Sequence, residues 1–346
     1  MKIEARPKNA LEWIALLANL APIPLVHSQL MPVLSRAVME ASTLDVFEAA
    51  KDGPITLEQA VEKTGLNQKA LHSLLQVLTS ADYFKYKNGT YSLTKMARKW
   101  CLKGSENSVY NMQKFNIICW DWMNNMGEYL KTGKGLQFHE TLNEDEWNAY
   151  QLGMADVSKV TAKMAAKMTP VPPNPSQMLD IGGAHGLYSI EMCKKYPTLE
   201  ATILDLPEAV EKAKPILDRY NSGQRVSYWE GDALKEDLGS GKYDIILISS
   251  LMHHFTAEQN KSLSSRVAKA LKPGGTYIIQ EFIRPEEGEK IEMIGAITDL
   301  FFNLSSTAGN WSLKELKDFQ TGAGLKHFKV NKYITLPGFV QVCGHK

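Results

Sequence analysis

The stretch that decides the fold is Met178–Leu187, which reads MLDIGGAHGL. It passes from an apolar strand at 178–181, through a glycine-rich turn, into a helix expected at 187–196. Small residues in such a turn let the backbone bend tightly and let a ligand approach the amide groups where the helix begins. The turn does not match the G-x-G-x-x-G pattern of dinucleotide-binding turns, because Gly186 is followed by Leu187. The stretch therefore predicts a ligand-binding loop and leaves the ligand open.

Strands and helices continue to alternate after this loop. We expect further strands at 201–204, 226–229, 244–249 and 276–281, and further helices at 208–220 and 257–271. Such alternation is typical of an α/β fold in which a doubly wound, Rossmann-like parallel sheet carries helices on both faces. Ligands of these sheets bind at the carboxyl ends of the strands, so we expect the site there.

Acidic residues and glycines follow the next strands at that edge. Asp205 ends the second strand, where a carboxylate can accept hydrogen bonds from both hydroxyls of a ribose. Gly231-Asp232 follows the third strand, and the segment 271–275 (LKPGG) ends the helix before the fifth. Each acidic residue alone is also explained as a cap of the local loop backbone. Together with the glycine loop, these features are more specific than any one of them.

On these features the segment 177–346 resembles the class I S-adenosylmethionine-dependent methyltransferases. The resemblance implies a seven-stranded sheet, S-adenosyl-L-methionine as cofactor, S-adenosyl-L-homocysteine as product, and no metal. In that family the loop 180–186 wraps the methionine part, the Asp205 position holds the ribose, and the Gly231-Asp232 position lies beside the adenine. The implied cofactor contacts are Asp180, Gly182, Gly183, Gly186, Asp205, Leu206, Gly231, Asp232, Ala233 and Ser249.

A histidine pair, His253-His254, follows the fourth strand, and Glu281 ends the fifth. A neutral imidazole at this edge can take a proton from a substrate hydroxyl. A carboxylate on the neighbouring strand can orient that imidazole and stabilise its protonated form. The structural alternative is that these are polar strand-end residues satisfied by loop backbone.

The amino-terminal part predicts a winged helix. Thr56 and Gln59 form a capping box for a helix that runs to Gly65, Asn67 can cap a second helix over 68–80, and a hairpin turns at Asn88-Gly89. The second helix carries only Lys69 and His72 among its apolar residues, too few for a DNA-reading helix. We therefore expect a packing and dimerisation module, and keep a DNA-binding regulator as the lesser alternative.

With the winged helix, the histidine and the glutamate, the whole chain resembles the small-molecule O-methyltransferases related to plant caffeate and animal hydroxyindole enzymes. By this resemblance His253 is the base. His254 remains the alternative base, because a shift of one residue in the match would exchange the two rings. The family's base is usually followed by Asp and Trp, where this chain has His254 and Phe255. The family has a second catalytic glutamate, and the matching position in this chain is Asn310. This chain therefore lacks one of the two carboxylates that flank the base in the family.

The expected acceptor is a small hydroxylated, flat and aromatic metabolite in an apolar pocket. The pocket residues assigned by helical spacing and by the resemblance are Trp120, Met123, Tyr150, Met154, His254, Phe301 and Phe302. Aromatic and Met stripes are also common in ordinary cores. Methylation of nitrogen or sulfur stays open, as does non-methylating chemistry on the same cofactor, such as hydroxylation, decarboxylation or cyclisation.

Proline-rich residues 170–175 suggest a domain junction. We expect a helical and winged-helix dimerisation domain at 1–104, linking helices at 105–174 and a catalytic domain at 175–346. The apolar segment 11–39 has little of its own to bury against, which favours a homodimer, although it could equally pack within one chain.

Composition limits the partners. The 346 residues contain 39 Lys and Arg against 38 Asp and Glu, a net charge of +1, which supplies no general attraction to nucleic acid or to membranes. No stretch approaches the roughly 20 apolar residues of a membrane-spanning helix. The four cysteines are scattered, as expected of reduced thiols, so we expect a cytoplasmic protein.

Overall fold

The computed structural model describes residues 7–220, 225–334 and 336–346. The chain divides into two compact units, one ending at Ile118 and the other beginning at Cys119. Residues 170–175 lie inside the second unit. The domain limits expected at 104 and 174 stay predictions.

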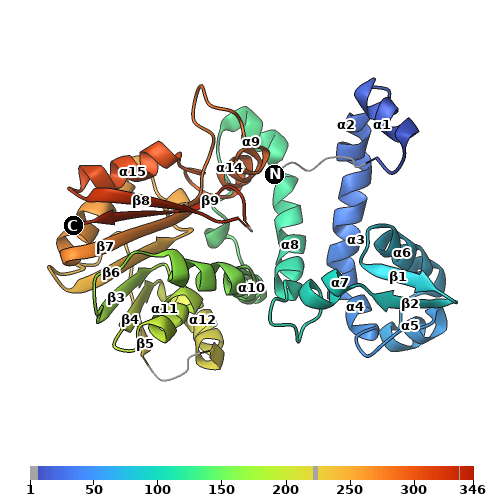
Figure 1. Cartoon of the computed structure of the whole chain (residues 1–346), viewed down its shortest axis with the longest axis horizontal. Helices are drawn as coiled ribbons and strands as arrows, with labels where there is room; N and C mark the ends of the chain where they lie inside the picture. Colours follow the sequence, from blue (N-terminus) through green and yellow to red (C-terminus); the bar gives the residue numbers. More distant parts are fainter. Residues whose placement is uncertain (1–6, 221–224, 335) are drawn as a thin grey trace. The chain divides into compact units, whose positions relative to one another are not determined.

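The second unit is built on a seven-stranded sheet (Figure 1). Its strands are β3 (Gln177–Ile181), β4 (Glu200–Asp205), β5 (Val226–Glu230), β6 (Tyr243–Ser249), β7 (Leu271–Phe282), β8 (Lys326–Lys332) and β9 (Phe339–His345). Their order is β5-β4-β3-β6-β7-β9-β8, in which β3 to β7 pair in parallel and β9 pairs antiparallel with both β7 and β8. The predicted α/β fold class is confirmed.

Helices cover both faces of this sheet. The helices of this unit, including α8, which begins in the first unit, are α8 (Tyr110–Met123), α9 (Met126–Thr132), η2 (Phe138–Glu140), α10 (Glu144–Met168), α11 (Leu187–Lys195), α12 (Pro207–Tyr220), η3 (Met252–His254), α13 (Ala257–Ala270), α14 (Met293–Ser305) and α15 (Leu313–Gly322).

The helix before β7 ends at Ala270, and Leu271 already pairs with Tyr243. A register shift then accommodates the Pro-Gly-Gly segment that we expected to lie outside the strand.

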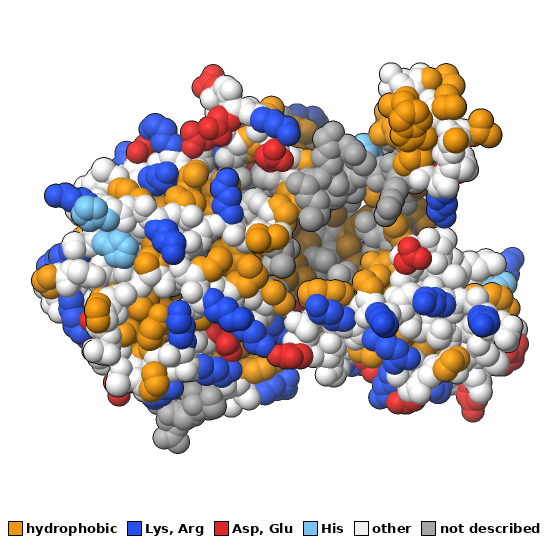
Figure 2. Space-filling model, in the orientation of Figure 1, with side chains coloured by type: hydrophobic (Ala, Val, Ile, Leu, Met, Phe, Trp, Pro, Cys, Tyr) orange, Lys and Arg blue, Asp and Glu red, His pale blue; other side chains and the backbone are white. Residues whose placement is uncertain are grey.

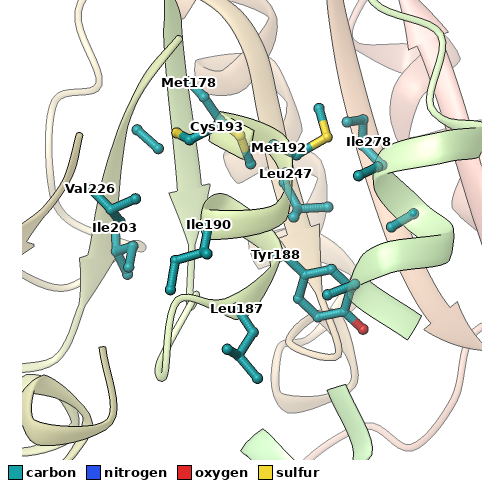
Figure 3. Close-up of a cluster of buried hydrophobic side chains, with 14 of the residues drawn as sticks. Met178, Leu187, Tyr188, Ile190, Met192, Cys193, Ile203, Val226, Leu247 and Ile278 are labelled. Carbon is teal, nitrogen blue, oxygen red and sulfur yellow. The ribbon is translucent and has the colours of Figure 1, made fainter. Parts of the chain in front are cut away.

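The core explains why the strands of this sheet are continuous apolar runs in the sequence. Met178 packs into the cluster beneath α10 and α11, whereas Leu179 and Ile181 pack into the cluster beneath α13 and α15. Strands whose side chains are buried alternately on two covered faces read as continuous apolar runs. Figure 3 shows the first of these clusters, where Ile190 and Cys193 of α11 lie over the sheet.

The strand order places the site. β3 is flanked by β4 on one side and β6 on the other, so the chain leaves the centre of the sheet in opposite directions. In such sheets a crevice forms at the carboxyl ends of the strands at this switch point. The loops that follow β3, β4, β5 and β6 therefore meet at one edge.

The first unit contains the predicted helix, turn, helix and hairpin. Its elements are α1 (Ala10–Leu17), α2 (Ile23–Leu25), η1 (Val26–Leu30), α3 (Met31–Thr43), α4 (Val46–Ala49), α5 (Leu57–Thr64), α6 (Gln68–Ser80), β1 (Phe84–Lys87), β2 (Thr90–Leu93) and α7 (Lys95–Trp100). Thr56 and Gln59 form the expected capping box, and the helix ends at Gly65 in the left-handed conformation. The winged-helix prediction is confirmed.

The segment 11–39 is several short helices, because Pro22 and Pro24 interrupt it. Much of its apolar surface is uncovered within this unit, and Figure 2 shows these side chains gathered over α1 and α2. The exposed apolar residues are Leu11, Trp13, Ile14, Leu17, Leu20, Leu25, Leu30 and Val33. Within the described ranges, no helix is both long enough and apolar enough to cross a membrane.

Candidate functional site

The glycine loop folds tightly against its own strand. Gly182 has a φ of +70°, and a Cβ there would lie 2.8 Å from the Leu251 side chain. Gly183 lies so close to the buried Asp180 carboxyl that a Cβ would come within 2.6 Å of it. Gly186 packs against Ile203 in the interior. The loop therefore tolerates little bulk, and its residues Gly182 and Ala184 line a cavity.

Asp180 is fully buried beneath this loop. Its Oδ2 accepts a hydrogen bond from Ser189 Oγ at 2.7 Å, while its Oδ1 has no protein partner. Burial raises the pKa of Asp180 to about 7. A buried acceptor without a partner is costly, about 1–3 kcal/mol, so this oxygen is suited to a hydrogen-bond donor from a ligand.

Asp205 joins the glycine loop to the end of β4. Its Oδ2 accepts from the Ala184 amide at 2.8 Å and its Oδ1 from the Leu206 amide at 2.9 Å. Burial raises the pKa of Asp205 to about 6. Each oxygen keeps a lone pair, so the carboxylate can still accept from two hydroxyls.

Asp232 follows β5, and its side chain partly acts as a cap of the local loop backbone. Its Oδ1 accepts from the Leu234 amide at 2.9 Å, and its Oδ2 lies 3.0 Å from Lys235 Nζ. It nevertheless faces the same cavity as Asp205. Its capping role and a ligand role are therefore compatible.

One cavity connects these loops. It is lined by His139, Trp147, Tyr150, Gln151, Gly182, Ala184, Leu204, Asp205, Leu206, Ala209, Gly231, Asp232, Ala233, Ser250, Leu251, His254 and Phe255. Six of the implied cofactor contacts belong to this set: Gly182, Asp205, Leu206, Gly231, Asp232 and Ala233. Asp180, Gly183, Gly186 and Ser249 are not among its lining residues. Ser250 lines it in place of Ser249, whose hydroxyl accepts from Gln280. The glycine cradle, the unpartnered Asp180 oxygen and the Asp205 carboxylate fit the cofactor that the resemblance implies.

Glu281 holds His253 through both of its carboxylate oxygens. Oε1 accepts from the Met252 amide at 2.7 Å, and Oε2 lies 3.0 Å from His253 Nδ1. Both side chains are buried. Because an ionised carboxylate only accepts hydrogen bonds, the hydrogen of a neutral His253 lies on Nδ1 and the lone pair on Nε2. The predicted pair is thus in contact, and neither side chain is among the residues that line the cavity. The role of His253 as base stays a prediction.

His254 instead pairs with a residue that the sequence did not suggest. Its Nε2 lies 3.3 Å from His139 Nε2. Burial lowers the pKa of His139 to about 4, and burial with the neighbouring His253 holds the pKa of His254 well below its usual range. Both rings are therefore neutral near pH 7. Only one of the two facing nitrogens then carries a hydrogen.

Asn310 is buried beside α14. Its Nδ2 donates to Thr298 Oγ1 at 3.1 Å, and its backbone amide donates to Asp299 Oδ1 at 3.0 Å. Its Oδ1 has no protein partner. Its hydrogen bonds thus run to the first turns of α14, and the nearby Ala308 amide donates to the His253 carbonyl.

The predicted pocket residues are only partly brought together. Phe302 packs on His253 with ring centroids 4.1 Å apart and touches Phe301. Tyr150 and His254 line the cavity, and Met123 is exposed. The predicted pocket residues that do not line the cavity are Trp120, Met123, Met154, Phe301 and Phe302. The acceptor assignments stay predictions.

Trp147 and Gln151 also line the cavity and were not predicted. A signal for them exists, because Asn143 and Glu146 form a capping box that starts α10. On this helix Trp147, Tyr150 and Gln151 share one face at spacings of three and four residues. His139, in the short turn η2, has no comparable signal. Over the described ranges, no group of three or more His, Cys, Asp or Glu side chains is placed to hold a metal ion.

Comparisons with known proteins identify the family of the chain. Residues 121–326, more than half of the chain, match the model of the O-methyltransferase domain, and residues 26–103 match that of the O-methyltransferase dimerisation domain.

Two curated relatives align over most of their own length. The 3-hydroxy-5-methyl-1-naphthoate 3-O-methyltransferase of Streptomyces sahachiroi is 22% identical over 85% of this chain and 86% of the relative. Acetylserotonin O-methyltransferase of Bos taurus is 24% identical over 79% of this chain and 82% of the relative. The solved structure of human N-acetylserotonin methyltransferase in complex with SAM is 17% identical, with a TM-score of 0.81 over 99% of each chain, and supports the fold.

Proposed function

The chain belongs to the O-methyltransferase family, and from this premise we propose that it methylates a hydroxyl group of a small aromatic metabolite, using S-adenosylmethionine and His253 as general base. The observation that carries the proposal is the double anchoring of Glu281, on the Met252 amide and on His253 Nδ1.

The cofactor supplies the methyl group from its sulfonium. Asp205 is suited to the ribose hydroxyls, Gly231 and Asp232 to the adenine side, and the loop 182–186 with Asp180 to the amino-acid part. The solved structure of human N-acetylserotonin methyltransferase, which resembles this chain, is a complex with SAM and supports this cofactor.

His253 is favoured over His254 by its partner. Glu281 faces His253 and can stabilise the imidazolium that forms when Nε2 accepts the hydroxyl proton. His254 faces His139, which is itself neutral, and its lowered pKa makes it a poor proton acceptor. A buried carboxylate beside one ring only thus separates the roles of the two neighbours.

The test compares His253→Ala, His254→Ala and the exposed His72→Ala. Calorimetry with S-adenosylmethionine should give similar dissociation constants for His253→Ala and the wild type, whereas Asp205→Ala should abolish binding. Release of S-adenosylhomocysteine from hydroxyaromatic acceptors should be lost in His253→Ala and retained in His72→Ala. Full turnover by His253→Ala would falsify the assignment of the base.

We further propose a homodimer formed through the amino-terminal unit. The dimerisation-domain match covers residues 26–103, and the apolar side chains of α1 to η1 lie exposed within that unit. Burying such a patch against a second copy would remove apolar surface from water. A cytoplasmic location is proposed alongside, since all four cysteines are buried free thiols.

A further inference from the structure

His254 shares the cavity with His139 and Gln151, two uncharged polar side chains. His139 and His254 share a hydrogen bond between their Nε2 atoms, and Gln151 is buried with its Oε1 unpartnered. Among the described residues that line the cavity there are two carboxylates, Asp205 and Asp232, and no Lys or Arg. A negatively charged acceptor placed beside His254 would therefore meet no Lys or Arg among these lining residues.

The two imidazoles are held in place by rings. His139 stacks on Trp147 at a centroid distance of 5.3 Å and meets the edge of Tyr150 at 5.3 Å. His254 lies against His253, with centroids 4.1 Å apart. Among the described residues, the titratable groups next to this pair are His253, which contacts Glu281, and Tyr150, whose pKa is raised by burial and by the Asp205 carboxylate. Within the same ranges neither ring has a carboxylate partner that would stabilise its charged form, so the pair stays neutral.

A neutral pair of imidazoles linked through one hydrogen offers one further donor and one further acceptor. Gln151 adds an amide oxygen that needs a donor. These groups complement an amide, a hydroxyl or a carbonyl. A carboxylate beside these three side chains, in contrast, would be desolvated without a cationic side chain as partner and would meet the acceptor oxygen of Gln151.

We propose that His139, Gln151 and His254 make the enzyme selective for uncharged acceptors, so that hydroxyaromatic compounds bearing a carboxylate are poor substrates. The inference rests on the proposed function and adds the charge class of its substrate. It sets this chain apart from the Streptomyces sahachiroi relative, whose name describes a naphthoate acceptor.

The test uses two acceptors of nearly equal shape, 6-hydroxy-2-naphthamide and 6-hydroxy-2-naphthoate. Their dissociation constants are measured by calorimetry on the full chain saturated with S-adenosylhomocysteine, at a pH near 7. We expect the amide to bind at least about tenfold more tightly. Equal binding, tighter binding of the carboxylate, or no binding of either compound would overturn the inference.

A variant that introduces a positive charge tests the same inference through a gain of affinity for the carboxylate. His139→Arg should shift the ratio of the two dissociation constants by about tenfold toward the carboxylate, because a guanidinium supplies charge-assisted hydrogen bonds. His139→Lys is the second variant if the first does not fold, and the exposed His72→Arg is the control. An unchanged ratio in a folded variant that binds S-adenosylhomocysteine contradicts the inference. Failure of the wild type to bind S-adenosylhomocysteine at all would instead contradict the proposed function.

Discussion

Replacing Glu281 with Gln tests the catalytic arrangement with a change of a single atom. In the native protein one carboxylate oxygen accepts from the Met252 amide at 2.7 Å and the other faces His253 Nδ1 at 3.0 Å. If the amide of Gln keeps its oxygen on Met252, its NH2 group faces Nδ1. The hydrogen of His253 must then move to Nε2, which removes the lone pair that accepts the substrate proton. If the amide flips, its NH2 group meets the Met252 amide, donor against donor.

The magnitude follows from these two losses. Turning the amide so that it accepts from His253 Nδ1 leaves the Met252 amide without an acceptor, and a buried unsatisfied donor costs about 1–3 kcal/mol. The hydrogen bond between the charged carboxylate and protonated His253, which contributes about 1.5–3 kcal/mol, is lost as well. The sum of about 2.5–6 kcal/mol corresponds to a kcat lower by about 10²- to 10⁴-fold, at about 1.36 kcal/mol for each factor of ten.

The assay is steady-state release of S-adenosylhomocysteine, with the dissociation constant of S-adenosylmethionine measured in parallel. We expect that constant to stay within about twofold, because Glu281 is absent from the cavity lining. The exposed Glu289→Gln is the matched control. A kcat within threefold of the wild type would refute the role of Glu281 in orienting the base.

Two further predictions concern the cofactor site and the assembly. Because burial raises the pKa of Asp205 to about 6, above its ordinary value of 3.8, the carboxylate becomes protonated as pH falls through about 6. Affinity for S-adenosylmethionine should therefore drop between about pH 7.5 and 5, and calorimetry of Asp205→Asn should show a smaller step, the remainder belonging to Asp180, whose pKa burial raises to about 7. Leu20→Glu, at a side chain 74% exposed, should convert the dimer to monomer in light scattering, whereas Ile334→Glu, at one 88% exposed, should not. A dimer that survives Leu20→Glu together with Trp13→Glu would argue against this interface.

Much of the site was predictable because it depends on local sequence and one topological rule. Strand ends are marked by Ile181, Asp205 and Ser249, and parallel strands bring the following loops to one edge. The contact between His253 and Glu281, 28 residues apart, follows from the pairing of β6 with β7.

The partner of His254 could not be predicted in this way. His139 is 115 residues away and lies in a three-residue turn without periodicity, entered through Gln137 in the left-handed conformation. Its position depends on how the segment between α9 and α10 packs, for example on the hydrogen bond from the Leu136 amide to Leu304. Such contacts are tertiary, and no spacing rule encodes them.

The same distinction applies to Asn310, which stands where the family has a second glutamate. Its amide donates to Thr298, and its backbone is held by Asp299, whose pKa burial raises. Asn310→Asp would lose the donor to Thr298 and place a second carboxylate beside Asp299. We therefore expect it to lower the free energy of unfolding by about 1–3 kcal/mol, measured by urea denaturation, and to lower kcat less than Glu281→Gln does. A loss of kcat as large as that of Glu281→Gln, with unchanged stability, would mean that Asn310 acts on His253 directly. If stability alone falls, a single carboxylate held at both oxygens is sufficient to orient the base.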